Sequence, residues 1–194
     1  MIWTHQRAGL TAAQTLTTLW TMDSTSNLAI TLKDVHNYWS QICQEDLDGR
    51  SSIQALLFQL EMDCLTFNER DNEQWIVHLA FFHKESLNLL QWHPEVLVVD
   101  STYKTNWFGL PLFNIFGILS IGKTFYCGGC FMKEDEPSFT WILQKLELIY
   151  LGFSHLHSLS PTTIVTDADP AMIAALATVF PDIHHFLCIW HIQK

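Results

Sequence analysis

Three aspartates are candidates for a functional site because of the residues that precede them. Asp100 follows the apolar run 96–99, and Asp167 follows the shorter run 164–166, with Asp169 close behind. Short β-branched runs of this kind are typical of strands that are buried on both faces of a sheet. A carboxylate at the end of such a strand is costly to bury unless something compensates its charge. Each aspartate alone would suit the cap of a turn, but the recurrence of one pattern favours a shared acidic site.

The elements around the aspartates are expected to bring two of them together. From residue 95 onward, the apolar pattern and the turns predict the order strand, strand, strand, helix, strand, helix, strand. Right-handed crossovers in such a chain place the strands that end in Asp100 and Asp167 side by side, with their carboxyl ends together. The elements expected after Asp100 are strands at 112–120 and 123–132, a helix at 138–150, a strand at 164–166, a helix at 170–179 and a strand at 183–187.

Two neighbouring carboxylates either share a proton or bind a hard cation such as Mg²⁺. A pair of such ions about 3.5–4 Å apart can clamp the attacking and leaving oxygens of a phosphoryl displacement. The fold class predicted from the residues is therefore α/β, with a mixed sheet and flanking helices of the kind found in ribonuclease H-like nucleases.

The first 92 residues are expected to form a mostly helical extension that ends in a small hairpin. Pairs that resemble capping boxes begin at Thr11, Thr31 and Ser51, and they predict three helices. Two helices across a polar turn would suit a helix-turn-helix reader of DNA, but these helices carry almost no Lys or Arg, which favours a small bundle. Strands are expected at 65–67 and 75–82. We therefore predict an extension at 1–92 and a main domain at 93–194.

Composition limits the classes of protein. Hydrophobic residues make up 48% of the 194 residues, so a packed core is expected. No apolar run approaches the roughly 20 residues of a membrane span, and no secretory signal is visible. The five cysteines are an odd, scattered set, which favours a reducing compartment over a disulfide framework. The formal net charge of −10 conflicts with the basic face that DNA-binding proteins usually present.

Five stretches carry a further signal: DSTYKTN at 100–106, LPLFNIFG at 110–117, E-x-E-P-S-F-x-W at 134–141, TDADPAM at 166–172 and FPDIHHFLCIWHIQK at 180–194. Together they resemble a Mutator-like (MULE) transposase domain over roughly residues 95–194. The resemblance implies a ribonuclease H-like fold with a D-D-E acidic triad that cuts and joins DNA in the nucleus, using Mg²⁺ or Mn²⁺. It implies Asp100 as the first acid and Asp167 as the second, with Asp169 as the alternative, and both acids as Mg²⁺ ligands.

The chain also departs from the family pattern. The family's third acid lies downstream of a Cys-x-x-His motif, and the sequence stops at Lys194, just after that motif. We therefore expect a C-terminally incomplete fragment of a transposase that is inactive alone, with the DNA of transposon ends as the implied partner, no membrane, and a homo-oligomer as an open alternative. The rival interpretations are a transposase-derived DNA-binding or regulatory protein without catalysis, and an inert transposon relic.

The motif itself is Cys188 with His191, which is half of a zinc site. Cys127 and Cys130 would supply the other half, but residues three apart on a strand point to opposite faces. A structural role without zinc is therefore preferred.

Tryptophans in polar surroundings suggest decay. Trp107 stands in the segment where the family has TNR or TNxY, and an Arg codon CGG becomes a Trp codon by a single transition. Trp20 and Trp39 have similar polar neighbours. We therefore predict that this sequence is a decayed transposon copy that has lost basic residues. We also expect the side chain of Trp107 to be exposed.

Overall fold

The computed structural model describes residues 4–5, 8–22, 29–102, 106, 109–153 and 160–189. The chain divides into two compact units, Met1–Gln59 and Leu60–Lys194. Each unit is described by itself below. In the described part of the chain, none of the helices is long and apolar enough to cross a membrane.

The first unit is helical, as predicted. Its helices are α2 (Ala12–Met22), α3 (Leu32–Leu47) and the start of α4 (Ser52–Asp63). Thr31 and Asp34 form a reciprocal capping box at the start of α3. The same pair of hydrogen bonds joins Thr11 to Gln14 before α2, and residues 51 and 54 at the start of α4. All three predicted helix starts are confirmed, because each box satisfies backbone N–H groups that have no partner within the helix.

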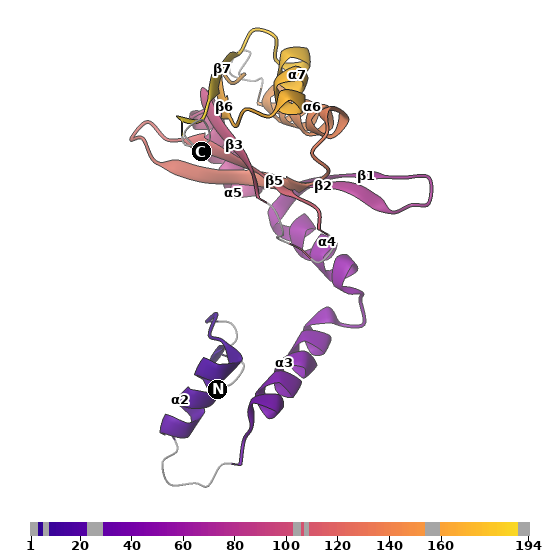
Figure 1. Cartoon of the computed structure of the whole chain (residues 1–194), viewed down its shortest axis with the longest axis vertical. Coiled ribbons are helices and arrows are strands. Elements are labelled where there is room, and N and C mark those ends of the chain that lie inside the picture. Colours follow the sequence, from indigo (N-terminus) through magenta and orange to yellow (C-terminus); the bar gives the residue numbers. More distant parts are fainter. Residues whose placement is uncertain are drawn as a thin grey trace. The chain divides into compact units, whose positions relative to one another are not determined.

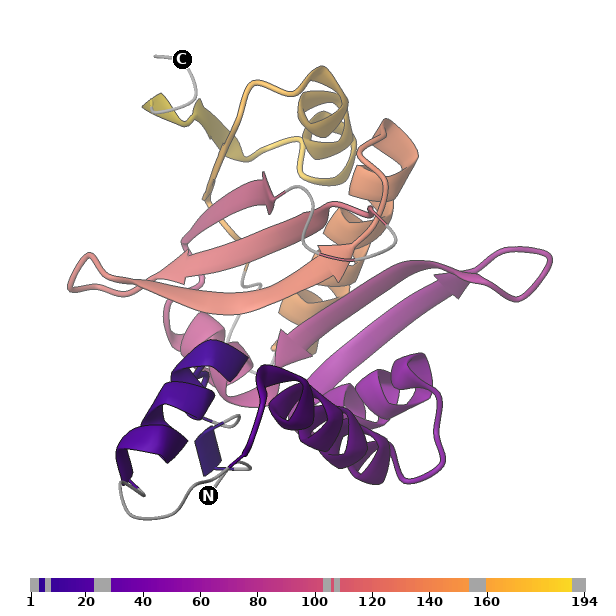
Figure 2. The ribbon, with the colours of Figure 1, turned by 60° about the horizontal axis from the view of Figure 1, so that its bottom comes forward.

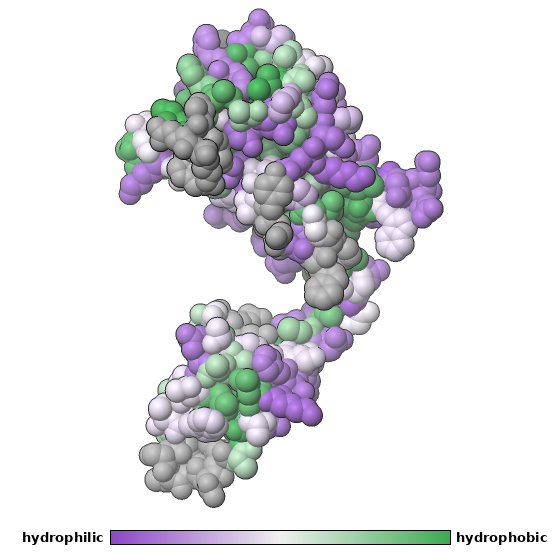
Figure 3. Space-filling view, in the orientation of Figure 1, coloured by the Kyte–Doolittle hydropathy of each residue, from purple (hydrophilic) through white to green (hydrophobic). Residues whose placement is uncertain are grey.

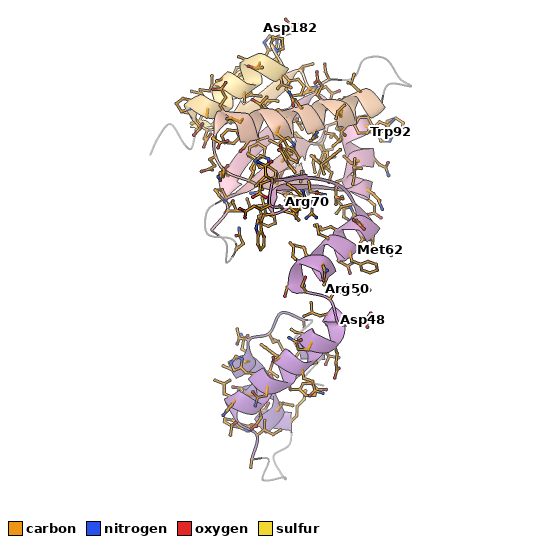
Figure 4. All side chains as sticks on the ribbon, turned by 90° about the vertical axis from the view of Figure 1, so that its right-hand side faces the viewer. Asp48, Arg50, Met62, Arg70, Trp92 and Asp182 are labelled. Atoms are coloured by element: carbon orange, nitrogen blue, oxygen red, sulfur yellow. The ribbon has the colours of Figure 1, made fainter. Side chains whose placement is uncertain are left out.

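A small apolar cluster joins α2 to α3 in this unit. Ala12, Leu16 and Val35 are buried in it, and Trp39 packs against it. The expectation of polar surroundings is therefore wrong for Trp39, whereas Trp20 is 53% exposed. Figure 3 shows other hydrophobic side chains at the surface among hydrophilic ones. Asp48 and Arg50 form an exposed ion pair of 3.6 Å in the connection between α3 and α4 (Figure 4).

The second unit is built on one seven-stranded sheet with the order β1-β2-β5-β4-β3-β6-β7 (Figure 1). β3 pairs in parallel with β6, and β6 with β7, while the other neighbours are antiparallel. The strands are β1 (Cys64–Arg70), β2 (Ile76–His83), β3 (Val96–Thr102), β4 (Leu112–Ile118), β5 (Thr124–Phe131), β6 (Thr163–Thr166) and β7 (His184–Leu187).

This topology is ribonuclease H-like, as the sequence predicted. The antiparallel strands β3, β4 and β5 are neighbours in chain order, with β4 between the other two, and the parallel strands β6 and β7 continue the sheet on the side of β3. The predicted order of elements from residue 95 is confirmed. The helices of this unit are α5 (Lys84–Trp92), α6 (Glu136–Gly152) and α7 (Pro170–Val179).

The hairpin β1-β2 belongs to this sheet, because β2 pairs with β5 from Leu79↔Phe131 to Phe82↔Gly128. The division of the chain after residue 59 therefore differs from the boundary expected at 92/93. Figure 2 shows the hairpin extending the sheet beyond β5. The pairing of β2 with β5 could not be predicted from the sequence of the hairpin, because the two strands lie far apart in the chain and meet only when the protein folds.

The core lies between the sheet and the helices α6 and α7. Leu97 and Ile164 are fully buried on the sheet side, and Ile142 and Leu146 are fully buried on α6. Asp135 begins α6 by accepting a hydrogen bond of 2.9 Å from the Ser138 amide. Hydrogen bonds with the Ser138 side chain and, to a lesser extent, with its amide hold the pKa of the Asp135 carboxyl below its usual value, since they favour the charged form.

A bulge in β5 changes which side chains face this core. Ile115 pairs with Gly128 and Phe116 pairs with Tyr126, so Cys127 has no partner of its own on β4. An extra residue reverses the alternation of side chains along a strand. Cys127 and Cys130 are consequently both buried in the core, and the prediction that they point to opposite faces is wrong.

The close approach of β5 to β2 yields a test of this packing. A Cβ atom at Gly128 would lie 2.2 Å from the Phe81 carbonyl oxygen and 2.9 Å from the Phe82 Cα, both of which are backbone atoms. Gly128→Ala should therefore lower the free energy of unfolding by about 3 kcal/mol, since the strands must separate to admit it. Gly152→Ala is the matched control, because a Cβ there meets nothing within 4 Å. Urea denaturation followed by tryptophan fluorescence measures both, and equal stability of the two variants would contradict the pairing.

Candidate acidic site

Asp100 lies in β3, and Asp167 is the first residue after β6, at the position that would pair with Asp100 if the register of the two strands continued. The parallel pairs of β3 and β6 are Val96↔Thr163, Leu97↔Ile164 and Val98↔Val165, a constant difference of 163 − 96 = 67. Asp100 and Asp167 differ by the same number, 167 − 100 = 67. The prediction that these two strands are parallel neighbours is confirmed. β3 continues to Thr102, however, so Asp100 lies inside its strand and not at its end.

Both aspartates face away from the helices that cover the core. Leu97 and Val99 are buried in the core, and Ile164 holds the equivalent place on β6. Side chains alternate between the faces of a strand, so Asp100 is on the opposite face of β3. The same alternation, continued one residue past the end of β6, would put Asp167 on that face as well. Both are partly buried. Both carboxylates therefore lie close to the sheet and remain accessible to a ligand.

Asp169 has a different role from Asp100 and Asp167, at the start of α7. Its Oδ1 accepts hydrogen bonds from the amides of Ala171 at 2.8 Å and Met172 at 3.0 Å, which makes it the N-cap of α7. Its own amide lies 3.4 Å from Oδ1 of Asp167. Pro170 at the first helical position fits this start, because its missing N–H would have no partner there. The cap accounts for the Asp169 carboxylate, and the turn it closes holds Asp167 beside β3.

Neutral polar groups lie beside Asp100, and the sequence analysis did not identify them. Asn114 pairs directly with Asp100 across β3 and β4. Its Nδ2 lies 3.1 Å from Oγ1 of Thr102. The hydroxyl of Tyr126 reaches over Gly129, where an added Cβ would lie 2.5 Å from it, and burial raises the pKa of Tyr126 to about 12. The only signal in the sequence was Asn114, a polar residue in the middle of an apolar strand.

A second polar arrangement joins the hairpin to α6. His78 Nδ1 lies 2.8 Å from Oε2 of Glu69, and His78 Nε2 lies 2.9 Å from Oγ of Ser138. The order Ser-His-Glu matches that of serine hydrolase triads. Ser138, however, is only 2% exposed, so its hydroxyl is not open to a substrate. The arrangement satisfies buried polar groups, and the ring of Trp141 packs 5.0 Å from that of His78.

The cysteines of the zinc hypothesis lie in different surroundings. Cys127 and Cys130 sit among apolar core residues, where burial raises the pKa of the Cys127 thiol to about 12 and that of Cys130 higher still. Cys188 follows β7 and is partly buried, and its amide bonds to the Thr166 carbonyl oxygen at 2.6 Å. His191 and Trp107 lie outside the described residues. Within the described ranges, no cluster of three or more His, Cys, Asp or Glu could hold a metal ion.

Comparison with known proteins places this geometry in a family. Residues 96–194 match the MULE transposase domain. The chain is 28% identical over 173 residues to a protein named PKS-NRPS hybrid synthetase cheA from Chaetomium globosum, covering 84% of this chain and 4% of that protein. It is 26% identical over 181 residues to Protein FAR1-RELATED SEQUENCE 5 from Arabidopsis thaliana, covering 87% of this chain and 21% of that protein.

A third relative, Putative protein FAR1-RELATED SEQUENCE 10 from Arabidopsis thaliana, is 30% identical over 138 residues, with 70% of this chain and 19% of that protein covered. The chain thus spans between 4% and 21% of the length of these relatives. The matched family domain begins at the first residue of β3 and includes Asp100, Asp167 and Cys188. This chain belongs to the MULE transposase domain family.

Proposed function

We propose that this chain contributes the metal-binding part of a DNA transposase, in which Asp100 and Asp167 hold a divalent cation, Mg²⁺ or Mn²⁺. The observation that supports the proposal is the parallel register of β3 and β6, which would bring Asp167 level with Asp100 if it continued past the last pair, Val98↔Val165. The DNA of transposon ends is the proposed substrate, and the nucleus is the proposed location. Cleavage and strand transfer belong to the whole transposase, of which these residues supply two acids.

The donor set fits such a cation. Two carboxylates side by side on one face of a sheet repel each other, and a divalent ion relieves that repulsion. Mg²⁺ prefers oxygen ligands and is commonly held by one or two carboxylates. When bound, the ion supplies Lewis-acid activation of a phosphodiester. The chain's own contribution is to orient the acids: pairing with β4 fixes Asp100, and the capped turn before α7 fixes Asp167.

The second unit has few Lys and Arg side chains that could contact DNA phosphates. Lys84 donates to the main-chain oxygens of Glu61 and Met62, and Arg70 donates to the carbonyl oxygen of Gln74. Lys145 lies 5.3 Å from the ring centroid of Trp141. With these side chains engaged and a net charge of −10, affinity for DNA phosphates is expected to be low and to depend on the bound cation.

A transposase-derived regulator without catalysis is the second candidate. The observation that favours it is that, among the described residues, no group of three His, Cys, Asp or Glu could hold a metal ion. The two candidates differ in one property that can be measured on the purified chain. A regulator that has only kept the fold has no need of a cation at Asp100 and Asp167.

Metal affinity is the first test. Asp100→Asn and Asp167→Asn should each weaken Mn²⁺ binding by about tenfold or more, since each removes one charged ligand while keeping its shape. Isothermal titration with Mg²⁺ and electron paramagnetic resonance with Mn²⁺ measure the affinities. Asp182→Asn is the matched control, because it removes the same charge from an exposed residue in the connection between α7 and β7 (Figure 4). Equal affinity in all three variants would refute the site.

The second test separates Asp167 from Asp169. Asp169→Ala should lower the free energy of unfolding by about 1 kcal/mol through loss of the α7 cap. Asp169→Ser should restore that stability, because a serine hydroxyl also caps helices, although it has no carboxylate. Asp169→Ser, which keeps the cap, should bind Mn²⁺ nearly as the unchanged protein does. Should Asp169→Ser lose metal affinity as Asp167→Asn does, Asp169 would be the second acid.

The third test concerns cleavage. The 194-residue chain should bind the cation without cutting DNA, because in the described part of the chain no third acid or histidine completes a metal cluster with the pair. Nicking of a supercoiled plasmid in Mg²⁺ or Mn²⁺ measures the activity. Metal-dependent nicking that disappears in Asp167→Asn would mean that these residues already form a complete active site.

A further inference from the structure

We infer that the side-chain oxygen of Asn114 is a third ligand of the cation held by Asp100 and Asp167. This inference rests on the proposed function of that pair. Asn114 lies directly opposite Asp100 in the antiparallel pairing of β3 and β4, where Cβ atoms are about 4.5–5.5 Å apart. Its neighbours Phe113 and Ile115 are buried in the core on the other face. Asn114 therefore projects from the face that carries the acids.

Hydrogen bonds fix the orientation of the Asn114 amide. Nδ2 lies 3.1 Å from the Leu112 carbonyl oxygen, 3.1 Å from Oγ1 of Thr102 and 3.4 Å from the Asp100 carbonyl oxygen. Main-chain carbonyl oxygens only accept hydrogen bonds, so the amide nitrogen must be the atom that faces them. Oδ1 then points away from these groups. In the described part of the chain, the hydrogen bonds of the Asn114 side chain all run through Nδ2.

The position of Asn114 complements that of Asp167. Neighbouring strands lie about 4.8 Å apart, and the register puts Asn114 on one side of Asp100 and Asp167 on the other. A cation above Asp100 would have an oxygen donor on each side. Amide carbonyl oxygens are ordinary ligands of hard cations. A neutral third ligand also adds coordination without adding to the repulsion between the two carboxylates.

The alternative is that Asn114 only fastens Thr102 and β3 to β4. That role uses Nδ2 and leaves Oδ1 without a function. Two variants separate the roles. Asn114→Asp keeps an oxygen but removes the donor, and Thr102→Val keeps the Asn114 oxygen but removes the hydroxyl that accepts a hydrogen bond from Nδ2. A purely structural asparagine makes both variants less stable and leaves their metal binding unchanged.

The experiment titrates the full chain with Mn²⁺, and with Tb³⁺ as a luminescent probe, for the unchanged protein, Asn114→Ala, Asn114→Asp, Thr102→Val and Asp100→Asn. Asn114→Ala should weaken Mn²⁺ binding by about tenfold, and Tb³⁺ lifetimes in H₂O and D₂O should reveal one more coordinated water. Thr102→Val should bind Mn²⁺ nearly normally. Asn114→Asp should bind at least as tightly as the unchanged protein, and Mn²⁺ should raise its Tm by more.

Three outcomes would overturn the inference. Unchanged affinity and hydration in Asn114→Ala, while Asp100→Asn loses binding, would leave the acidic pair as the site and remove Asn114 from it. If Asn114→Ala does not fold, Asn114→Asp decides the question, because a Tm shift with Mn²⁺ no larger than that of the unchanged protein contradicts a ligand at this position. An unchanged protein that binds neither ion would overturn the proposed function and the inference together.

Discussion

The parallel pairing of β3 with β6 is the constraint on which the site depends. These strands are connected through β4, β5 and α6, and their register is fixed where Leu97 and Ile164 enter the core beneath the helices. A shift of one residue would turn the side chains of a strand to its other face. The apolar residues that secure the register would therefore bring Asp167, just past the end of β6, level with Asp100 on one face.

The two faces of the sheet have different roles. The face toward α6 and α7 is closed by apolar packing, and even its cysteines are held there as neutral thiols because the β5 bulge turns both inward. The opposite face carries the acids with Asn114 and the hydroxyl of Tyr126, which burial keeps protonated. Stability comes from the first face, so the second can hold two charges that would not stabilise the fold by themselves.

The sequence predicted the parts of the fold whose signals are local. The capping pairs at Thr11, Thr31 and Ser51 each lie within a few residues and were found where expected. The two short apolar runs before the aspartates form parallel neighbours as predicted, although β3 continues past Asp100. The errors involve distant partners. The union of β2 with β5, the β5 bulge and the burial of Trp39 depend on segments far away in the chain. Asn114 was missed because one polar residue in an apolar strand has no periodicity.

The central claim is that Asp100 and Asp167 share one cation. Anomalous diffraction from crystals soaked in Mn²⁺, recorded at the manganese absorption edge, tests it most directly. The account predicts a single strong peak on the face away from α6, within coordination distance of both carboxylates. A structure with the peak elsewhere, or with the two carboxylates turned to opposite faces of the sheet, would contradict it.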